Sequence, residues 1–301
     1  MTRNKNKVDG IIIVDKPKNI TSNKLLQKIK HIFNAKKAGH TGSLDPITTG
    51  TLPICFGEAT KVSKYLIESS KSYHVVFKLG EKTNTGDSDG IVTDKKAFTQ
   101  PSKEHCESIL KSFIGDMEQT PPMFSSIKVN GIRLYKHARK GLIIPRKKRT
   151  INIHNIHLKN IFFDSIELII HCGKGTYIRS LVEDIAAKLG TFAHVIKLRR
   201  ISIDVIKDHE LITLESLESE QNYNRLIENY LLPIDIAIES LPKLSVTLTE
   251  STNFKQGQRI KLVLNSDYNT GKVRVYDSND SLIGLGVTDN EGSVQPMRIF
   301  N

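Results

Sequence analysis

The amino-acid sequence predicts an α+β protein, with a large mixed domain over residues 1–242 and a small β-rich domain over residues 243–301. Apolar and polar residues alternate over residues 72–79, which is typical of a strand with one buried face. Apolar residues recur at helical spacing after Tyr177, and Gly190 marks the end of that helix. The two patterns in one chain predict a sheet that is flanked by helices.

The charge balance favours a polyanionic partner. The 301 residues carry 44 Lys and Arg against 32 Asp and Glu, which gives a formal net charge of +12. Such an excess creates a positive field that attracts nucleic acid. A generally lysine-rich composition is the alternative explanation, and charge alone does not decide between the two.

Cysteine usage and the N-terminus predict a cytoplasmic protein. Cys55, Cys106 and Cys172 are far apart and form no CxxC pair, which argues against a disulfide framework or a structural zinc site. The apolar run over residues 11–14 ends at Asp15, so it is too short for a signal peptide or a membrane span. We expect no membrane association, no metal and no cofactor, since the sequence also shows no dinucleotide or phosphate-binding loop.

The first elements are a buried strand over residues 10–14 and an amphipathic helix after Thr21 and Ser22, either of which can cap it. Lysines on the polar face of this helix fit either a solvated surface or phosphate contacts, and both interpretations stay open. The apolar face of the helix consists of Leu25, Leu26, Ile29, Ile32 and Phe33.

A loop is predicted over residues 38–50, where glycines recur without an apolar period. It contains Asp45, and Pro46 biases the backbone of Asp45 toward an extended conformation. Because glycines allow a ligand to approach the backbone closely, a carboxylate in this loop can act as a nucleophile or a general base. An Asp-Pro step in an ordinary turn is the alternative, and the loop alone favours that interpretation.

Residues 122–150 differ in character from the rest of the chain. They contain many lysines and arginines and no acidic residue, and they follow Pro121. A basic, weakly patterned insertion of this kind is a candidate for an arm that orders on a polyanion.

The remaining elements follow the same reasoning. Strands are predicted over residues 151–158 and 165–171, and residues 208–241 are predicted to be helical or mixed. The pattern changes after Leu241-Pro242, where glycines separate short strands and indicate a compact β-module. These strands are predicted over residues 259–264, 272–276 and 282–287.

Three further side chains could belong to a site. Arg179 follows Tyr177 where a strand passes into a helix, and there it could hold a carboxylate ionised and aimed. A surface arginine in the first helical turn is an equally good interpretation. Tyr73, at the start of a strand, could stack on a nucleobase, although a lone tyrosine at such a position is more often a core residue.

A series of short segments decides between these interpretations: residues 10–17, 39–46, 50–54, 57–61, 71–73, 83–90, 175–179 and 194–200. With these segments, in the same order, the sequence closely resembles the TruB family of tRNA pseudouridine-55 synthases. The resemblance extends over most of the chain, and the loop around Asp45 is its most specific part.

The resemblance implies the pseudouridine synthase fold, a mixed, mainly antiparallel sheet with flanking helices and loops. Residues 122–150 match the family's RNA-clamping insertion in position and charge. Residues 243–301 resemble the PUA domain, a small β-barrel that binds RNA. The catalytic domain would then comprise residues 1–242.

The resemblance also assigns roles to individual residues. Asp45 matches the catalytic aspartate, and Arg179 matches the arginine that pairs with it. Tyr73 matches the tyrosine that stacks on the target uracil, and Tyr177 matches a second active-site tyrosine. His40 matches the loop histidine that lies against the displaced nucleotide.

Two further positions and the reaction follow from the same resemblance. Leu198 matches an apolar residue that lines the base pocket, and Asp87 matches an acidic position near the site. The expected activity is isomerisation of uridine 55 in the T loop of tRNA to pseudouridine, on a flipped-out nucleotide and by a monomer. Attack of Asp45 on C1′ of the ribose and attack on C6 of the base both stay open.

Three other function classes are compatible with parts of the same sequence. A non-catalytic RNA-binding or tRNA-folding protein would use the same basic surface. A glycosidic-bond hydrolase would need a second carboxylate, for which Asp87 and Glu58 are candidates. A DNA-binding regulator is disfavoured because the sequence shows no readable recognition helix.

Overall fold

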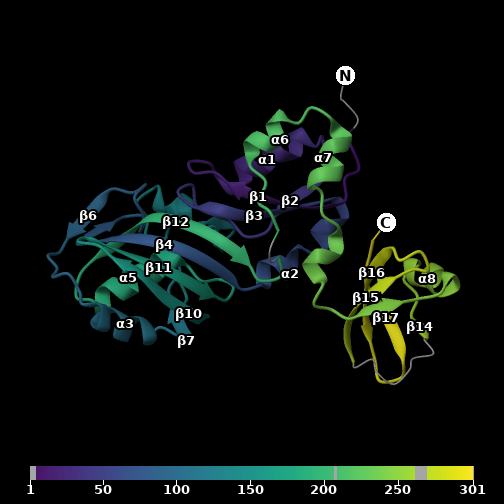
Figure 1. Cartoon of the computed structure of the whole chain (residues 1–301). Coiled ribbons are helices and arrows are strands. Elements are labelled where there is room, and N and C mark those ends of the chain that lie inside the picture. Colours follow the sequence, from purple (N-terminus) through teal and green to yellow (C-terminus); the bar gives the residue numbers. More distant parts are fainter. Residues whose placement is uncertain (1–4, 207–208, 262–269, 301) are drawn as a thin grey trace.

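The computed structural model describes residues 5–206, 209–261 and 270–300. Its largest part is an eight-stranded sheet in the order β1-β3-β12-β4-β11-β10-β7, with β2 paired to β3 (Figure 1). The strands of this sheet are β1 (Gly10–Lys16), β2 (Ala38–His40), β3 (Thr49–Phe56), β4 (Lys71–Leu79), β7 (Gly115–Gln119), β10 (Arg149–Ile161), β11 (Ser165–Cys172) and β12 (Ala193–Ile203).

One strand pair breaks the antiparallel pattern of this sheet. Strands β12 and β3 run parallel, with Arg199 opposite Thr49 and Arg200 opposite Gly50. The other neighbours in the sheet pair antiparallel. The prediction of a mixed, mainly antiparallel sheet is therefore confirmed. The parallel contact brings the end of β12 against the strand that leaves the 38–50 loop.

The predicted alternation over residues 72–79 is confirmed, since every second residue of β4 is buried. Helices α5 (Ile178–Lys188) and α3 (Lys103–Lys111) pack against β12 and β10 respectively, on one side of the sheet (Figure 1). The resulting core fully buries Phe77 of β4, Leu168 of β11 and Leu181 of α5.

The N-terminal helix forms where the capping signal predicted it. Helix α1 (Ser22–Ile32) begins after Thr21, whose side chain accepts a hydrogen bond of 3.1 Å from the backbone N–H of Lys24. The polar face is solvated in part, because Lys28 forms an exposed ion pair with Glu218. The loop after α1 differs from the prediction in that it starts with the short strand β2, whose three residues show no alternation.

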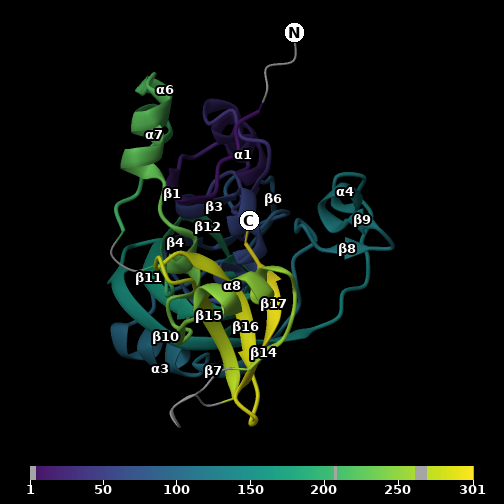
Figure 2. The ribbon, with the colours of Figure 1, turned by 90° about the vertical axis from the view of Figure 1, so that its right-hand side faces the viewer.

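The basic insertion contains more regular structure than its pattern indicated. It forms a small hairpin and a short helix that stand away from the main sheet in Figure 2. Arg146, near the end of the insertion, donates a hydrogen bond of 3.2 Å to the carbonyl of Pro121, the residue that precedes the insertion. The elements are β8 (Lys128–Val129), β9 (Ile132–Arg133) and α4 (Leu134–Ala138).

Several short elements complete the larger unit. In the segment predicted as helical or mixed, residue 208 lies outside the described residues, and helices follow from Leu214 onward. These elements are η1 (Gly57–Lys61), α2 (Ser63–Glu68), β5 (Glu81–Thr83), β6 (Val92–Lys95), α6 (Leu214–Ser219), α7 (Tyr223–Tyr230) and η2 (Ile234–Ile238).

The C-terminal unit is a curled five-stranded sheet in the order β13-β15-β16-β17-β14 (Figure 1). The strands predicted over residues 272–276 and 282–287 are present, whereas residues 262–264 of the third predicted strand lie outside the described residues. Helix α8 was not predicted, although Thr247 and Glu250 form a capping box at its start. The elements are β13 (Lys243–Ser245), α8 (Leu248–Lys255), β14 (Ile260–Lys261), β15 (Gly271–Tyr276), β16 (Leu282–Thr288) and β17 (Ser293–Ile299).

The two sheets meet through a small apolar cluster. Leu285 and Phe300 of the C-terminal unit pack with Ile11 and Ile13 of β1. A hydrogen bond of 2.6 Å from the Tyr276 hydroxyl to the Asp235 carboxylate adds a polar contact. The domain boundary at residue 242 stays a prediction. In the described part of the chain, no helix is both long and apolar enough to cross a membrane.

Candidate active site

Backbone contacts hold the loop that carries Asp45 against the first helix. The hydroxyl of Ser22 accepts a hydrogen bond of 2.8 Å from the Leu44 N–H and donates one of 3.1 Å to the Leu44 carbonyl. The Asn19 N–H donates to the carbonyl of Pro46 at 2.8 Å. The residues on both sides of Asp45 are thus fixed before any ligand arrives.

Lys16 also holds this loop in place, through hydrogen bonds to its backbone. Its side chain is fully buried, and its ammonium donates to the carbonyls of Pro17, Pro46 and Thr48 at 3.0, 3.3 and 2.7 Å. Burial lowers the pKa of Lys16 to about 8, although the nearby Asp45 charge opposes this effect. Sequence patterns assign Lys16 no role beyond its place in a family segment, because a lysine at a strand end is normally solvated.

Arg179 joins Asp45 to a second carboxylate. Its Nε lies 2.9 Å from the Asp45 carboxylate, and its Nη1 lies 3.6 Å from the Asp87 carboxylate. The same guanidinium donates to the carbonyls of Thr85 and Phe124 at 2.5 and 2.7 Å. The Arg179 and Asp87 side chains are each 5% exposed and the Asp45 side chain is 39% exposed, so only Asp45 opens toward solvent.

Burial and Arg179 act on Asp45 in opposite directions. Desolvation raises the pKa of Asp45, and the negative charge of Asp87 raises it further. The charge and the hydrogen bond of Arg179 lower this pKa, as does the charge of Lys16. Although part of the carboxylate is exposed, the protein packed around it makes desolvation the largest of these effects.

Tyr177 is anchored at the start of α5 by its backbone. Its N–H donates to the Gln119 side-chain carbonyl at 2.8 Å, and its carbonyl accepts from the amide nitrogen of Gln119 at 3.0 Å. Burial raises the pKa of Tyr177, and the positive charges of Arg149 and Arg179 oppose the rise. No local sequence pattern indicates Gln119, which is the last residue of β7.

The other predicted residues come from neighbouring strands. Tyr73 of β4 is 9% exposed and Leu198 of β12 is 5% exposed, and both belong to the core cluster that includes Leu44. His40 ends β2, and burial is the main cause that lowers its pKa. In the described part of the chain, His40 shares no ion pair or hydrogen bond with Asp45. Its position is set by the pairing of β2 with β3, in which His40 lies opposite Ile54.

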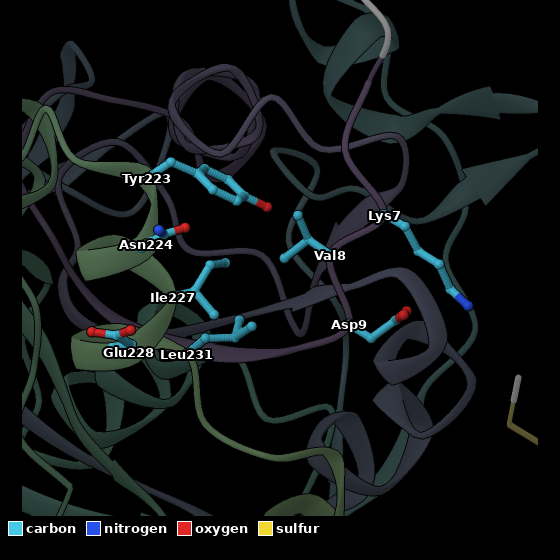
Figure 3. A pocket seen from close by; sticks show the side chains of 8 residues that line it. All are labelled: Lys7, Val8, Asp9, Tyr223, Asn224, Ile227, Glu228 and Leu231. Carbon is cyan, nitrogen blue, oxygen red and sulfur yellow. The ribbon is translucent and has the colours of Figure 1, made fainter.

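Two cavities lie elsewhere. One of about 360 Å³ separates the N-terminal segment from α7, with Val8, Tyr223 and Leu231 in its wall (Figure 3). The other, of about 620 Å³, lies next to residues 97–102. Neither wall contains a predicted site residue. Among the residues that the structure describes, no His, Cys, Asp and Glu side chains gather as metal ligands, and the three cysteines are buried and free.

Comparison with known proteins identifies the family. Residues 30–178 match the N-terminal domain of TruB family pseudouridylate synthases, and residues 179–239 match the tRNA pseudouridylate synthase B C-terminal domain. Residues 242–300 match the C-terminal domain of pseudouridine synthase II TruB.

Relatives that match over nearly the whole length support the same assignment. The tRNA pseudouridine synthase B of Buchnera aphidicola subsp. Acyrthosiphon pisum is 46% identical over 99% of this chain and 97% of its own. That of Coxiella burnetii is 42% identical over 98% of this chain and 96% of its own. One chain in the structure of an H/ACA ribonucleoprotein bound to a substrate RNA containing 2'-deoxyuridine shares the fold, with a TM-score of 0.72, 24% identity, and coverage of 97% of this chain and 85% of that chain. The chain therefore belongs to the TruB family of tRNA pseudouridine synthases, which are isomerases.

Proposed function

We propose that this enzyme converts uridine 55 in the T loop of tRNA to pseudouridine, with Asp45 as the catalytic carboxylate. The observation that carries the proposal is the 2.9 Å contact between Arg179 Nε and the Asp45 carboxylate. A carboxylate that is held by a guanidinium and is open on one side is a nucleophile with a defined direction.

The reaction is an isomerisation in which atoms and electrons balance. The bond between N1 of uracil and C1′ of the ribose breaks, the base turns, and C5 bonds to C1′. C5 loses a proton and N1 gains one, so the reaction consumes no oxidant, reductant or water. Asp45 attacks either C1′ of the ribose or C6 of the base, and both routes require the carboxylate to be ionised.

The surrounding side chains suit a flipped-out pyrimidine. Eversion of the uridine costs about a few kcal/mol, and stacking on Tyr73 returns about 1–3 kcal/mol. We assign Leu198 to the apolar wall of the base site, and Tyr177 and His40 to contacts with the displaced nucleotide. Asp87 binds the same arginine as Asp45, and we assign it to holding Arg179 in place.

Basic surfaces would bind the rest of the RNA. We assign the insertion at residues 122–150 and the C-terminal unit at residues 243–301 to contacts with the T-arm stem-loop. Because lysines and arginines displace counterions from phosphates, binding should weaken steeply as the salt concentration rises. We further propose that the enzyme acts as a monomer in the cytoplasm.

The test replaces Asp45 by Asn in cells that lack their own copy of the enzyme. The T loop of tRNA from these cells should carry uridine at position 55, whereas wild-type protein should restore pseudouridine there. Asp94→Asn is the matched control, because Asp94 is an exposed carboxylate on β6. It should restore the modification fully.

Other results would point to other functions. Modified tRNA from the Asp45→Asn strain would contradict the role of Asp45 and favour a non-catalytic RNA-binding protein. Release of free uracil from RNA by the purified wild-type enzyme would indicate a hydrolase instead.

A further inference from the structure

Arg200 lies on β12, between the strand that carries Tyr73 and the strand that follows the Asp45 loop. On one edge of β12 it pairs with Tyr73 of β4, directly opposite in the antiparallel ladder. On the other edge it pairs with Gly50 of β3, which follows the Asp45 loop. One residue therefore connects the strand of the proposed stacking tyrosine with the strand that leaves the catalytic loop.

The side chain of Arg200 runs beneath this loop and is buried. The residue is 1% exposed, and its Nε donates a hydrogen bond of 2.6 Å to the carbonyl of Thr51. A Cβ atom added to Gly42 would lie 3.4 Å from Nη1, which places the guanidinium next to the loop backbone. Burial is the main cause that lowers the pKa of His40 and of Lys16, and the positive charge of Arg200 lowers both further.

This cation lacks the compensation that a buried charge normally has. No carboxylate in the described part of the chain forms an ion pair with Arg200. Its Nη2 is buried and has no hydrogen-bond partner among the described residues. Because an unpaired buried guanidinium is costly, a free donor at this position indicates an acceptor that is engaged during function.

Tyr73 lies directly opposite Arg200 in the pairing of β4 with β12, so the two side chains lie on the same face of the sheet. Burial raises the pKa of the Tyr73 hydroxyl, and the positive charge of Arg200 opposes the rise. The other charged or titratable groups that face this hydroxyl are Cys172 of β11 and Asp45 of the loop, and both raise the pKa. Arg200 is the cation among these groups, and its charge opposes the effect of burial on the Tyr73 oxygen.

We propose that Arg200 is a positioning residue for the isomerisation and that it acts through Tyr73. Its guanidinium fixes the direction of the Tyr73 hydroxyl, and the free Nη2 donates to that oxygen once the uridine is seated. The inference rests on the proposed function, because it requires Tyr73 to contact the flipped base. It predicts an effect on the chemical step rather than on RNA affinity.

The test is a double-mutant cycle with Arg200→Gln and Tyr73→Phe, read by single-turnover rates and RNA dissociation constants on a T-arm stem-loop. Arg200→Gln should slow turnover about 10- to 100-fold, as expected for loss of a charged hydrogen bond. The dissociation constant should change less than about twofold. In the Tyr73→Phe background the same substitution should cost less than about threefold, because the acceptor is gone.

Arg199→Gln is the matched control. Arg199 precedes Arg200 on β12, but its guanidinium pairs with Asp15 at 2.7 and 2.9 Å and is 35% exposed. Its rate should stay within about twofold of wild type. An equal loss from Arg200→Gln with and without the Tyr73 hydroxyl, an unchanged rate, or a loss confined to RNA affinity would each overturn the inference.

A spectroscopic measurement separates this role from a purely structural one. NMR titration of protein with carbon-13 in its tyrosine rings, with the Tyr73 signal identified by Tyr73→Phe, should show a higher phenolic pKa in Arg200→Gln than in wild type. An unchanged pKa contradicts the inference. If Arg200→Gln does not fold, Arg200→Lys takes its place in the kinetic cycle, with an expected loss of about 3- to 10-fold that disappears without the hydroxyl.

The two proposals fail in different ways. An Asp45→Asn enzyme that still forms pseudouridine would contradict the proposed function. A wild-type enzyme that depends on Asp45, but whose Arg200 variants show no coupling to Tyr73, would contradict only the role of Arg200.

Discussion

Arg179 and Arg200 are both buried near the Asp45 loop, but the protein compensates their positive charges to different extents. Arg179 contacts two carboxylates and two backbone carbonyls, so its charge is compensated within the protein. Arg200 donates to the carbonyl of Thr51 and has a buried nitrogen without a partner among the described residues. The Arg179 region is therefore complete before RNA binds, whereas the Arg200 region is left with an unused donor.

The largest effect is expected from breaking the compensated region. Arg179→Met leaves the buried Asp87 and the partly exposed Asp45 without their cation, which should lower the free energy of unfolding by about 3–5 kcal/mol. Loss of the positive charge should also raise the pKa of Asp45 and stop turnover at neutral pH. Urea denaturation and a single-turnover assay measure the two consequences.

A matched substitution shows whether burial causes this effect. Arg199 also pairs with a carboxylate, that of Asp15, but the pair is partly exposed. Arg199→Met should therefore cost no more than about 1 kcal/mol. Equal losses of stability in the two variants would contradict the view that the Arg179 region is a buried, interdependent network.

A smaller effect should follow from disturbing the backbone near Arg200. Gly50 has a φ of +98°, and an added Cβ would lie 2.2 Å from the Arg200 carbonyl oxygen. Gly50→Ala combines backbone strain with overlap and should cost about 3 kcal/mol. Gly42 has a φ of +85°, but its added Cβ would meet only Arg200 Nη1 at 3.4 Å, so Gly42→Ala should cost about 1 kcal/mol.

Thermal or urea denaturation of the two alanine variants ranks these costs. A larger loss of stability in Gly42→Ala than in Gly50→Ala would contradict the view that the close approach of β3 to β12 requires a glycine at position 50.

The smallest effect concerns the pH dependence of turnover. Because burial raises the pKa of Asp45, activity should fall on the acid side at a pH above the ordinary aspartate value of 3.8. The charge of Asp87 contributes to this rise. Asp87→Asn should therefore lower the pKa of Asp45 and move the acid limb of the single-turnover profile to lower pH. A limb that moves to higher pH would mean that Asp87 acts mainly by orienting Arg179.

Much of the fold could be predicted from local sequence patterns. Alternation marked β4, and the helical spacing before Gly190 marked α5, because both elements bury one face. Helix α8 escaped prediction because its apolar residues are few and its helical signal lies in the capping box at Thr247. The hairpin in the basic insertion involves only two residues in each strand, too few to leave a pattern.

Only some residues of the candidate site could be predicted from the sequence. Family segments indicated Asp45 and Arg179, and the structure brings these two side chains into contact. Local patterns assign no role to Lys16 or Arg200, because a cation in a strand normally reaches solvent, whereas the folded chain buries both side chains. Their function depends on which backbone carbonyls and side chains the fold brings to them, and no local pattern records that.

The central claim, that Asp45 held by Arg179 drives the isomerisation, is tested most directly by tritium release. A T-arm stem-loop whose target uridine carries tritium at C5 should release that tritium to water with wild-type enzyme and with Asp94→Asn. Asp45→Asn should release none above background while binding the RNA as tightly as wild type. Tritium release by folded Asp45→Asn at a rate near that of wild type would contradict the account.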